Sequence, residues 1–458
     1  MTDVGPLPRV ARGQLATLVT SPIALWGAFV VVHFWLGLLG LAGPGLPLGD
    51  VSLVYKFWVQ HGFEAHQWVG LDTPWVYPIV ALLPMIAADA FGPGVYDSTW
   101  LSLVMIVDAA GFAVIMAFGR DRRAAPVAWW WLALLLFLGP VALGRIDSIT
   151  APIAIVGMLC LATAPRLAGV LLAVATWIKV WPAALIAAVL IAIRERARFA
   201  TGVAAASGVI VVGAFLLGGG EYLLSFVSQQ TGRGLQIESG IGTFWMWDSL
   251  FHPERTSIYY DGTILTYQLR GPGVEIAAAI ATPLIGIAVA ALLVIAVLAT
   301  RRGVPAAELL PPLALAITTA LIVFNKVGSP QFVTWLAVPI VLGLATRATG
   351  HGMSFRVPAI LALAIAGLTQ IMYPNFYQEV LQSNPVLLLV LSARNLLYVV
   401  LLVWAVVALV GRLRTGVDLE LVDESNWLPR VWPFGVVTRM SSSPAATAPE
   451  PVEGRDPG

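Results

Sequence analysis

A succession of apolar segments, most of them close to the length of a membrane span, sets the strongest limit on how this chain can fold. Of its 458 residues, 59% are hydrophobic and only 11% are charged, whereas a soluble domain carries about 25% charged residues. A helix needs roughly 20 apolar residues to cross the hydrocarbon core of a bilayer. The composition therefore predicts an all-α polytopic membrane protein.

The arginines orient these segments, because loops rich in Lys and Arg stay on the cytoplasmic side. Arg9 and Arg12 place the amino terminus inside, so the first span runs outward. The apolar piece 78–91 is then expected to be a re-entrant or surface-lying element of the outer side, because a crossing there would put the arginines of 120–123 outside. The predicted spans, about twelve in all, are 22–41, 98–118, 127–143, 149–164, 167–177, 183–193, 199–217, 274–300, 309–324, 332–346, 357–373 and 385–410.

This topology divides the chain into three parts. Residues 1–21 form a cytoplasmic amino terminus, and 22–410 form the membrane domain. Residues 411–458 form a cytoplasmic tail, whose end is rich in Pro, Ser, Ala and Glu and is expected to be disordered. Two outer loops are prominent, the first outer loop at 44–77 and a long outer loop at 218–273.

The first outer loop gathers many aromatic rings near Asp50. We interpret Asp50 as a general base held at the outer membrane surface, since a carboxylate there can take a proton from an attacking hydroxyl. Asp50 also follows a Pro/Gly turn and opens an apparent amphipathic stretch at 51–60. The alternative is therefore that Asp50 only caps a helix.

All three lysines, Lys56, Lys179 and Lys326, fall on the outer side of this topology, against the positive-inside trend. Cations placed there need an anionic partner, and a lipid phosphate is the natural one. Two of the lysines lie in helix breaks, W-I-K-V-W-P and N-K-V-G-S-P-Q, of the kind that can line a polar cavity. The alternative is that the lysines snorkel and the tryptophans form an interfacial belt.

The sequence also predicts local roles for other charged residues. Asp147 either caps the helix that follows it or pairs with Arg145. Asp108 lies in the middle of a span, where we expect a packing or hydrogen-bonding role. His61 and His66 lack a third ligand at a fixed spacing, so no metal site is predicted.

Several short motifs occur in a characteristic order: the aspartate of the first outer loop, Tyr77-Pro78, G-R-I-D-S, I-K-V-W-P and N-K-V-G-S-P-Q-F-V-T-W-L. Together they resemble the GT-C superfamily of membrane glycosyltransferases. They are most similar to glycosyltransferase family 87, the bacterial polyprenyl-phosphate-mannose-dependent α-mannosyltransferases. The resemblance covers residues 22–410. It implies a GT-C-like helical bundle with outer loops and re-entrant elements, in the bacterial plasma membrane, with an extracytoplasmic active face.

The resemblance also implies the reaction. A hexose, most simply mannose, moves with inversion from a polyprenyl-phosphate carrier to a glycolipid or polysaccharide acceptor, with no other cofactor. It makes Asp50 the catalytic base and places Lys179 near the carrier phosphate, whose growing charge Lys326 or Arg145 would also neutralise. Further substrate-binding residues are expected at Tyr55, Lys56, Tyr77, Asp147, Trp181 and Gln331. The long outer loop offers Arg233, Gln236, Glu238, Trp245, Trp247 and His252 for an acceptor groove.

Two alternatives from other classes remain. A membrane transporter or lipid flippase would need a continuous path of charges at the midplane, for which only Asp108 and Arg394 qualify. A non-catalytic scaffold of envelope assembly would tolerate the loss of Asp50. Membrane lipids are expected partners in every case, and nucleic acid is not, because the chain has no basic block that could follow a phosphate backbone.

Overall fold

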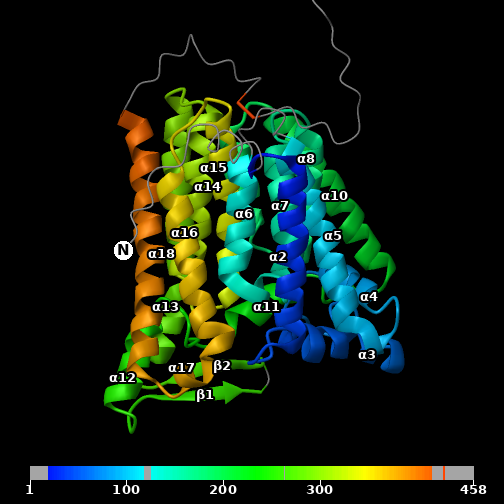
Figure 1. The fold of residues 1–458 in the computed structure, drawn as a ribbon, viewed down its shortest axis with the longest axis vertical. Helices are drawn as coiled ribbons and strands as arrows, with labels where there is room; N and C mark the ends of the chain where they lie inside the picture. The colour runs from blue at the N-terminus through cyan, green and yellow to red at the C-terminus, as the bar shows by residue number, and fades with distance from the viewer. Residues whose placement is uncertain (1–18, 118–124, 263, 415–426, 429–458) are drawn as a thin grey trace, which may run out of the picture.

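The protein is described by a computed structural model that covers residues 19–117, 125–262, 264–414 and 427–428 (Figure 1). These residues form a helical bundle with one antiparallel hairpin, β1 (Ser257–Asp261) and β2 (Thr266–Arg270). Nine helices of this part of the chain are long and apolar enough to cross a membrane. The all-α, multi-pass prediction is confirmed. These spans are α2 (Pro22–Ala42), α5 (Tyr96–Ala117) with the helical turn before it from Pro93, α6 (Ala125–Leu138) with the turn after it to Ala142, α10 (Arg196–Leu216), α13 (Val274–Arg301), α14 (Ala306–Val323), α15 (Val333–Ala348) with the turn before it from Pro330, α16 (Arg356–Gln370) with the turn after it to Asn375, and α18 (Pro385–Arg414).

Three predicted spans form shorter helices, α7 (Asp147–Leu159), α8 (Pro165–Ile178) and α9 (Ala183–Ala192). At 1.5 Å per residue, none of them reaches the ~30 Å thickness of a hydrocarbon core. They pack among the longer helices, and nearly every residue of α7 is buried. Every predicted span therefore lies on a helix, but the expected set of about twelve divides into long and short members.

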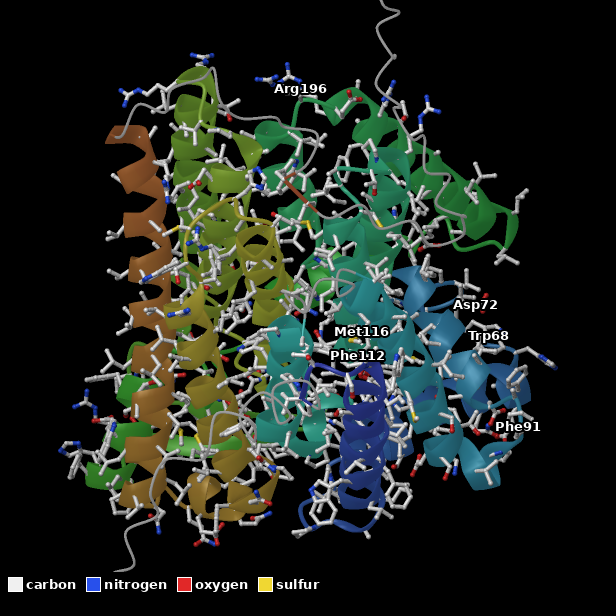
Figure 2. All side chains as sticks on the ribbon, turned by 45° about the horizontal axis from the view of Figure 1, so that its top comes forward. Trp68, Asp72, Phe91, Phe112, Met116 and Arg196 are labelled. Atoms are coloured by element: carbon white, nitrogen blue, oxygen red, sulfur yellow. The ribbon has the colours of Figure 1, made fainter. Side chains whose placement is uncertain are left out.

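Short helical turns join these helices. They are η1 (Asp50–Tyr55), η2 (Ile79–Ala81), η3 (Pro93–Val95), η5 (Gly139–Ala142), η6 (Pro330–Phe332) and η7 (Ile371–Asn375). The apolar piece 78–91 forms only η2 and the short α4 (Leu82–Ala88), which packs against α5. Phe91, which follows α4, is 80% exposed, and Figure 2 shows it at the edge of the bundle, on the same side as Trp68 and Asp72. The length of this element agrees with the predicted re-entrant or surface-lying piece.

The bundle has two distinct ends. At one end Arg302 donates to the carbonyl oxygen of Leu413, and Arg412 pairs with Glu308 at 2.9 Å. The opposite end carries α3 (Lys56–Ala65), α12 (Thr243–Phe251), α17 (Tyr377–Leu381) and the β-hairpin (Figure 1). Arginine-bearing helix ends and predicted outer loops are thus separated, although the side of the membrane on which each end lies stays a prediction.

The long outer loop predicted at 218–273 contains regular structure. It forms α11 (Ser225–Thr231), α12 and the hairpin, and it has a small core of its own in which Leu235, Met246 and Leu269 are buried. This core continues onto Leu388 of α18. The sequence did not predict these elements, because each is short and is stabilised by packing across the loop rather than by a long apolar run.

Some predictions fall outside the described residues. These are the orientation drawn from Arg9 and Arg12, the arginines of 120–123, and the disordered end of the tail.

Asp108 is buried where α5 packs against α2. Its Oδ2 lies 3.0 Å from Nε2 of His33, and Nδ1 of His33 lies 2.9 Å from the carbonyl oxygen of Phe29. The ring of Phe112, labelled in Figure 2, packs against Phe29 at a centroid distance of 5.0 Å. This agrees with the hydrogen-bonding role expected for Asp108, and it fixes α2, the helix that leads to the first outer loop.

We expect His33→Leu to lower the free energy of unfolding by about 1–3 kcal/mol, because the carboxyl group of Asp108 would stay buried without its side-chain partner. The measurement is the melting temperature of the purified protein in detergent. The double variant His33→Leu/Asp108→Leu, which removes both polar groups, should recover most of the loss. A single variant that melts like the wild type would show that the pair does not stabilise the fold.

Candidate functional site

Asp50 begins the turn η1, a few residues after the end of α2. It makes no capping hydrogen bond with its side chain, and Gly49 holds the cap position. Its Oδ2 instead lies 3.2 Å from Nε of Arg145, while 36% of its side chain stays exposed. The capping alternative therefore does not describe Asp50, whose carboxylate has one fixed cationic partner and one open side.

Arg145 is buried in the connection between η5 and α7. Its Nη1 donates to the carbonyl oxygens of Pro47 (2.9 Å) and Gly144 (2.8 Å), and its Nη2 donates to the hydroxyl of Tyr373 (2.7 Å). Burial disfavours its charge, but Asp50 and Tyr373 outweigh this effect, so the pKa of Arg145 lies above its ordinary value. With so many acceptors already engaged, Arg145 is better suited to hold Asp50 in place than to bind a phosphate.

Two tyrosines, the buried Tyr55 and the half-buried Tyr77, connect Asp50 with the rest of the site. Tyr55 lies on the same turn as Asp50 and accepts a hydrogen bond from the backbone N–H of Ile146 at 3.2 Å, and its ring centroid lies 6.3 Å from that of Tyr77. Burial raises the pKa of both hydroxyls, and the charge of Asp50 raises each of them further. Lys179 opposes this shift at Tyr77 without cancelling it. Both tyrosines are therefore neutral hydrogen-bonding groups at ordinary pH.

Lys179 projects from the point where α8 ends. Its backbone is extended, and Pro182 follows closely, so the helix cannot continue. Its Nζ lies 2.6 Å from Oδ2 of Asp147, which is fully buried, and 5.6 Å from the centroid of the Tyr77 ring. The indole of Trp335 donates to the other oxygen of Asp147. The proposed pairing of Asp147 with Arg145 is thus wrong, because Lys179 takes that place.

Lys179 lines a cavity of about 250 Å³, which we call the cation cavity. Two further cations line it, Lys326 from the loop after α14 and Arg233 from the loop after α11. Three of the residues predicted to bind substrate also line this cavity, namely Tyr77, Trp181 and Gln331. The Trp181 ring stacks on Trp335 at a centroid distance of 5.4 Å, which fixes one wall.

The cation cavity has polar groups that are not satisfied by the protein. Within the described residues, Nε of Arg233 and Oε1 of Gln331 are buried without a hydrogen-bond partner. Burial lowers the pKa of Lys326, and the nearby charge of Arg233 lowers it further. Burial also lowers the pKa of Arg233, although Tyr77 and Asp50 oppose this shift. An anion in the cavity would relieve this repulsion and accept hydrogen bonds from Arg233 and Lys326. Oε1 of Gln331 is an acceptor and would need a donor instead, such as a hydroxyl group.

The loop that carries Lys326 is held against a second segment of the chain. The backbone N–H of Gln236 donates to the carbonyl oxygen of Lys326 at 2.9 Å, and Asn325 accepts from the N–H of Val327 at 2.9 Å. A Cβ on Gly328 would come within 2.2 Å of the backbone nitrogen of Ser239. Only glycine fits this contact, and the close approach fixes Lys326 at the cavity wall.

Sequence reasoning and structure agree on part of this site. Asp50, Tyr55, Tyr77, Lys179 and Lys326 come together, although none of these positions establishes a role. Arg145 does not line the cation cavity, and Asp147 lies beneath it as the partner of Lys179. Lys56 is the first residue of α3 and does not line it either. Arg233, considered only for an acceptor groove, was missed as a member of the cation cluster, because no local pattern marks it.

The two candidate midplane charges have local partners. Oδ2 of Asp108 is bound by His33, and Nη1 of Arg394 lies 3.1 Å from Oε2 of Glu238. Neither residue lines the cation cavity. Over the described ranges, no group of three or more His, Cys, Asp or Glu side chains is placed to hold a metal ion.

Comparison with known proteins identifies the family. No curated protein is significantly similar to the chain. The sequence model of glycosyltransferase family 87 matches residues 75–324, which is more than half of the chain. The matched region contains Tyr77, Lys179 and Arg233. The chain therefore belongs to glycosyltransferase family 87 and is a membrane glycosyltransferase, as its motifs predicted.

Proposed function

We propose that this glycosyltransferase moves mannose, with inversion, from a polyprenyl-phosphate carrier to a hydroxyl of a glycolipid or polysaccharide acceptor. The proposed site faces the extracytoplasmic side of a bacterial plasma membrane. One observation carries the proposal: a partly exposed carboxylate, Asp50, is joined by the neighbouring rings of Tyr55 and Tyr77 to a cavity that three cations line. A sugar phosphate needs these two features on opposite sides of its anomeric carbon.

Asp50 acts as the general base in this proposal. It takes the proton of the acceptor hydroxyl while that oxygen attacks the anomeric carbon of mannose. Arg145 holds the carboxylate from its buried side, so the exposed side meets the acceptor. The neutral hydroxyls of Tyr55 and Tyr77 lie between the base and the cations, where they can orient the sugar.

The cation cavity receives the leaving group. As the bond between the anomeric carbon and the phosphate oxygen breaks, the phosphate keeps the electron pair and its negative charge grows. Lys326 and Arg233 supply positive charge for this phosphate, together with Lys179, which Asp147 already neutralises in part. Fixed cations in a partly buried site stabilise such developing charge far more than water does.

Asp50→Asn should abolish the general base and lower kcat for mannose transfer by about 10²–10⁴-fold. Binding of the donor should be retained, because the amide oxygen can still accept from Arg145. The assay uses purified protein, polyprenyl-phosphate mannose and a mannosylated acceptor. Glu64→Gln is the matched control, since Glu64 is exposed in α3 of the same loop. Normal transfer by Asp50→Asn would remove Asp50 from the mechanism, and no transfer by the wild type would reject the proposed donor.

Arg233→Gln should raise KM for the donor by about 10–100-fold, because a charge-assisted hydrogen bond to phosphate contributes roughly 1.5–3 kcal/mol. Arg270→Gln is a suitable control, since Arg270 stacks on Tyr259 in the hairpin, outside the cation cavity. The measurement is donor-dependent initial velocity at saturating acceptor. Equal effects of both substitutions would argue against a phosphate contact by Arg233.

Lys326→Arg should extend activity to higher pH. The pKa of Lys326 is lowered, so its charge is lost at a lower pH than for an ordinary lysine, and kcat/KM for the donor should fall as pH rises through that pKa. Arginine keeps its charge throughout this range. The alkaline limb of the profile of kcat/KM against pH should therefore move upward in Lys326→Arg. An unmoved limb would show that Lys326 does not control donor binding.

A further inference from the structure

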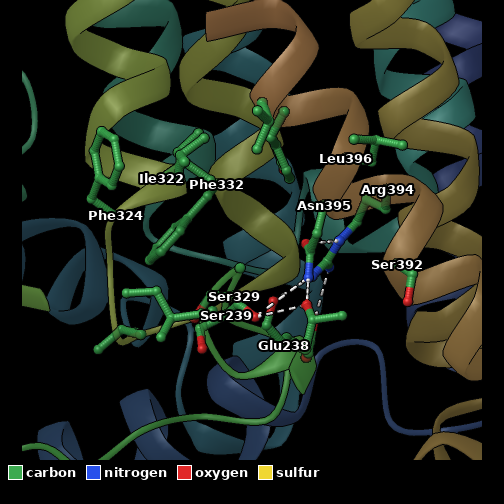
Figure 3. Close-up of a pocket in the computed structure, with 18 of the residues that line it drawn as sticks. Glu238, Ser239, Ile322, Phe324, Ser329, Phe332, Ser392, Arg394, Asn395 and Leu396 are labelled. Carbon is green, nitrogen blue, oxygen red and sulfur yellow. Dashed lines mark hydrogen bonds and ion pairs between the residues drawn. The ribbon is translucent and has the colours of Figure 1, made fainter. Parts of the chain in front are cut away.

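A second cavity, of about 430 Å³, adjoins the cation cavity, and Figure 3 shows side chains that line it. We call it the side cavity. It is enclosed by parts of α13, α14 and α18 and by the segment 238–243. The two cavities share three lining residues, Val327, Ser329 and Phe332. The two cavities therefore meet at these residues, with the side chain of Phe332 on their common wall.

The polar wall of the side cavity is closed by its own contacts. Arg394 pairs with Glu238 at 3.1 Å and donates from Nε to Asn395 at 3.1 Å (Figure 3). Asn395 in turn donates to Thr243 at 2.7 Å and to the carbonyl oxygen of Ser239 at 3.4 Å. The charged and amide groups are thus engaged with one another. The cavity suits a ligand part that forms no hydrogen bonds, which is a hydrocarbon chain.

The rest of the side cavity is apolar and reaches the outside of the bundle. Leu284 of α13, Ile322 and Phe324 line its wall. Leu396 and Val399 of α18 line it as well, yet they are 62% and 42% exposed. Helices α13 and α18 are both long enough to cross a membrane. Exposed apolar side chains on such helices face lipid, so the side cavity is accessible from the bilayer.

We propose that the side cavity binds the hydrocarbon chain of the carrier lipid, and that Phe332 is the residue around which the chain turns between the two cavities. This inference rests on the proposed function, because it takes the phosphate to lie in the cation cavity. Phe332 is suited to this place since its ring stacks on Trp335 at a centroid distance of 4.1 Å and is held there. The chain then leaves the bundle between α13 and α18, beside Leu396 and Val399.

The proposal predicts that a substitution at one position of α18 changes KM for a donor with a long carrier chain and not for a donor with a short one. Val399→Trp fills the side cavity and should raise KM for undecaprenyl-phosphate mannose by about tenfold or more. It should leave KM for geranyl-phosphate mannose unchanged, because that chain is too short to pass Phe332. Val403→Trp is the matched control, since Val403 lies one helical turn further on, is 55% exposed and lines neither cavity.

Binding of undecaprenyl phosphate without sugar, followed by native mass spectrometry, separates this inference from the proposed function. Binding that Val399→Trp weakens and Val403→Trp does not would support the side cavity even if no mannose were transferred. Mannose transfer with the same KM values for wild type and Val399→Trp would overturn the side cavity and leave the proposed reaction standing. The side-cavity inference would also be overturned if Val399→Trp raised KM equally for both donors. It would be overturned as well if the mass spectra showed bound phospholipid that undecaprenyl phosphate does not displace.

Discussion

The loop that carries Asp50 is fastened to the bundle by one buried guanidinium. Arg145 joins Asp50, the carbonyl oxygens of Pro47 and Gly144, and the hydroxyl of Tyr373. A buried charge costs several kcal/mol unless such partners surround it, so these segments have to assemble together. The end of the first span, the start of α7 and the turn η7 therefore meet at one point, and the position of Asp50 follows from this assembly.

The balance of charge in the cation cavity suits the proposed reaction. Asp147 offsets Lys179, and Lys326 and Arg233 add two further cations to the wall of the same cavity. A sugar phosphodiester carries a single negative charge, whereas the phosphate monoester that leaves approaches two at neutral pH. The cations therefore attract the developing leaving group more strongly than the intact donor. Binding that strengthens along the reaction accelerates it, whereas equally strong binding of the donor would not.

Local sequence patterns predicted what depends on local physics. Apolar runs located every span, and the prolines of W-I-K-V-W-P and N-K-V-G-S-P-Q placed two helix breaks beside a polar cavity, because proline cannot continue a helix. The pairing of Lys179 with Asp147 and of Arg394 with Glu238 could not be predicted in this way. The paired residues lie far apart in the chain and are brought together by packing of the helices, which produces no periodic pattern in the sequence. Arg233 was misjudged for the same reason.

The segment 235–239 supports both cavities at once. Gln236 holds the backbone of Lys326, Glu238 holds Arg394, and Gly328 packs so closely on Ser239 that no side chain fits between them. In the proposed arrangement, the phosphate and the hydrocarbon chain of the carrier lipid lie on opposite sides of the segment 235–239. Adaptation to a different carrier during evolution would then require paired substitutions, one in each cavity. A change in the wall of one cavity would displace the segment 235–239 and so alter the other cavity.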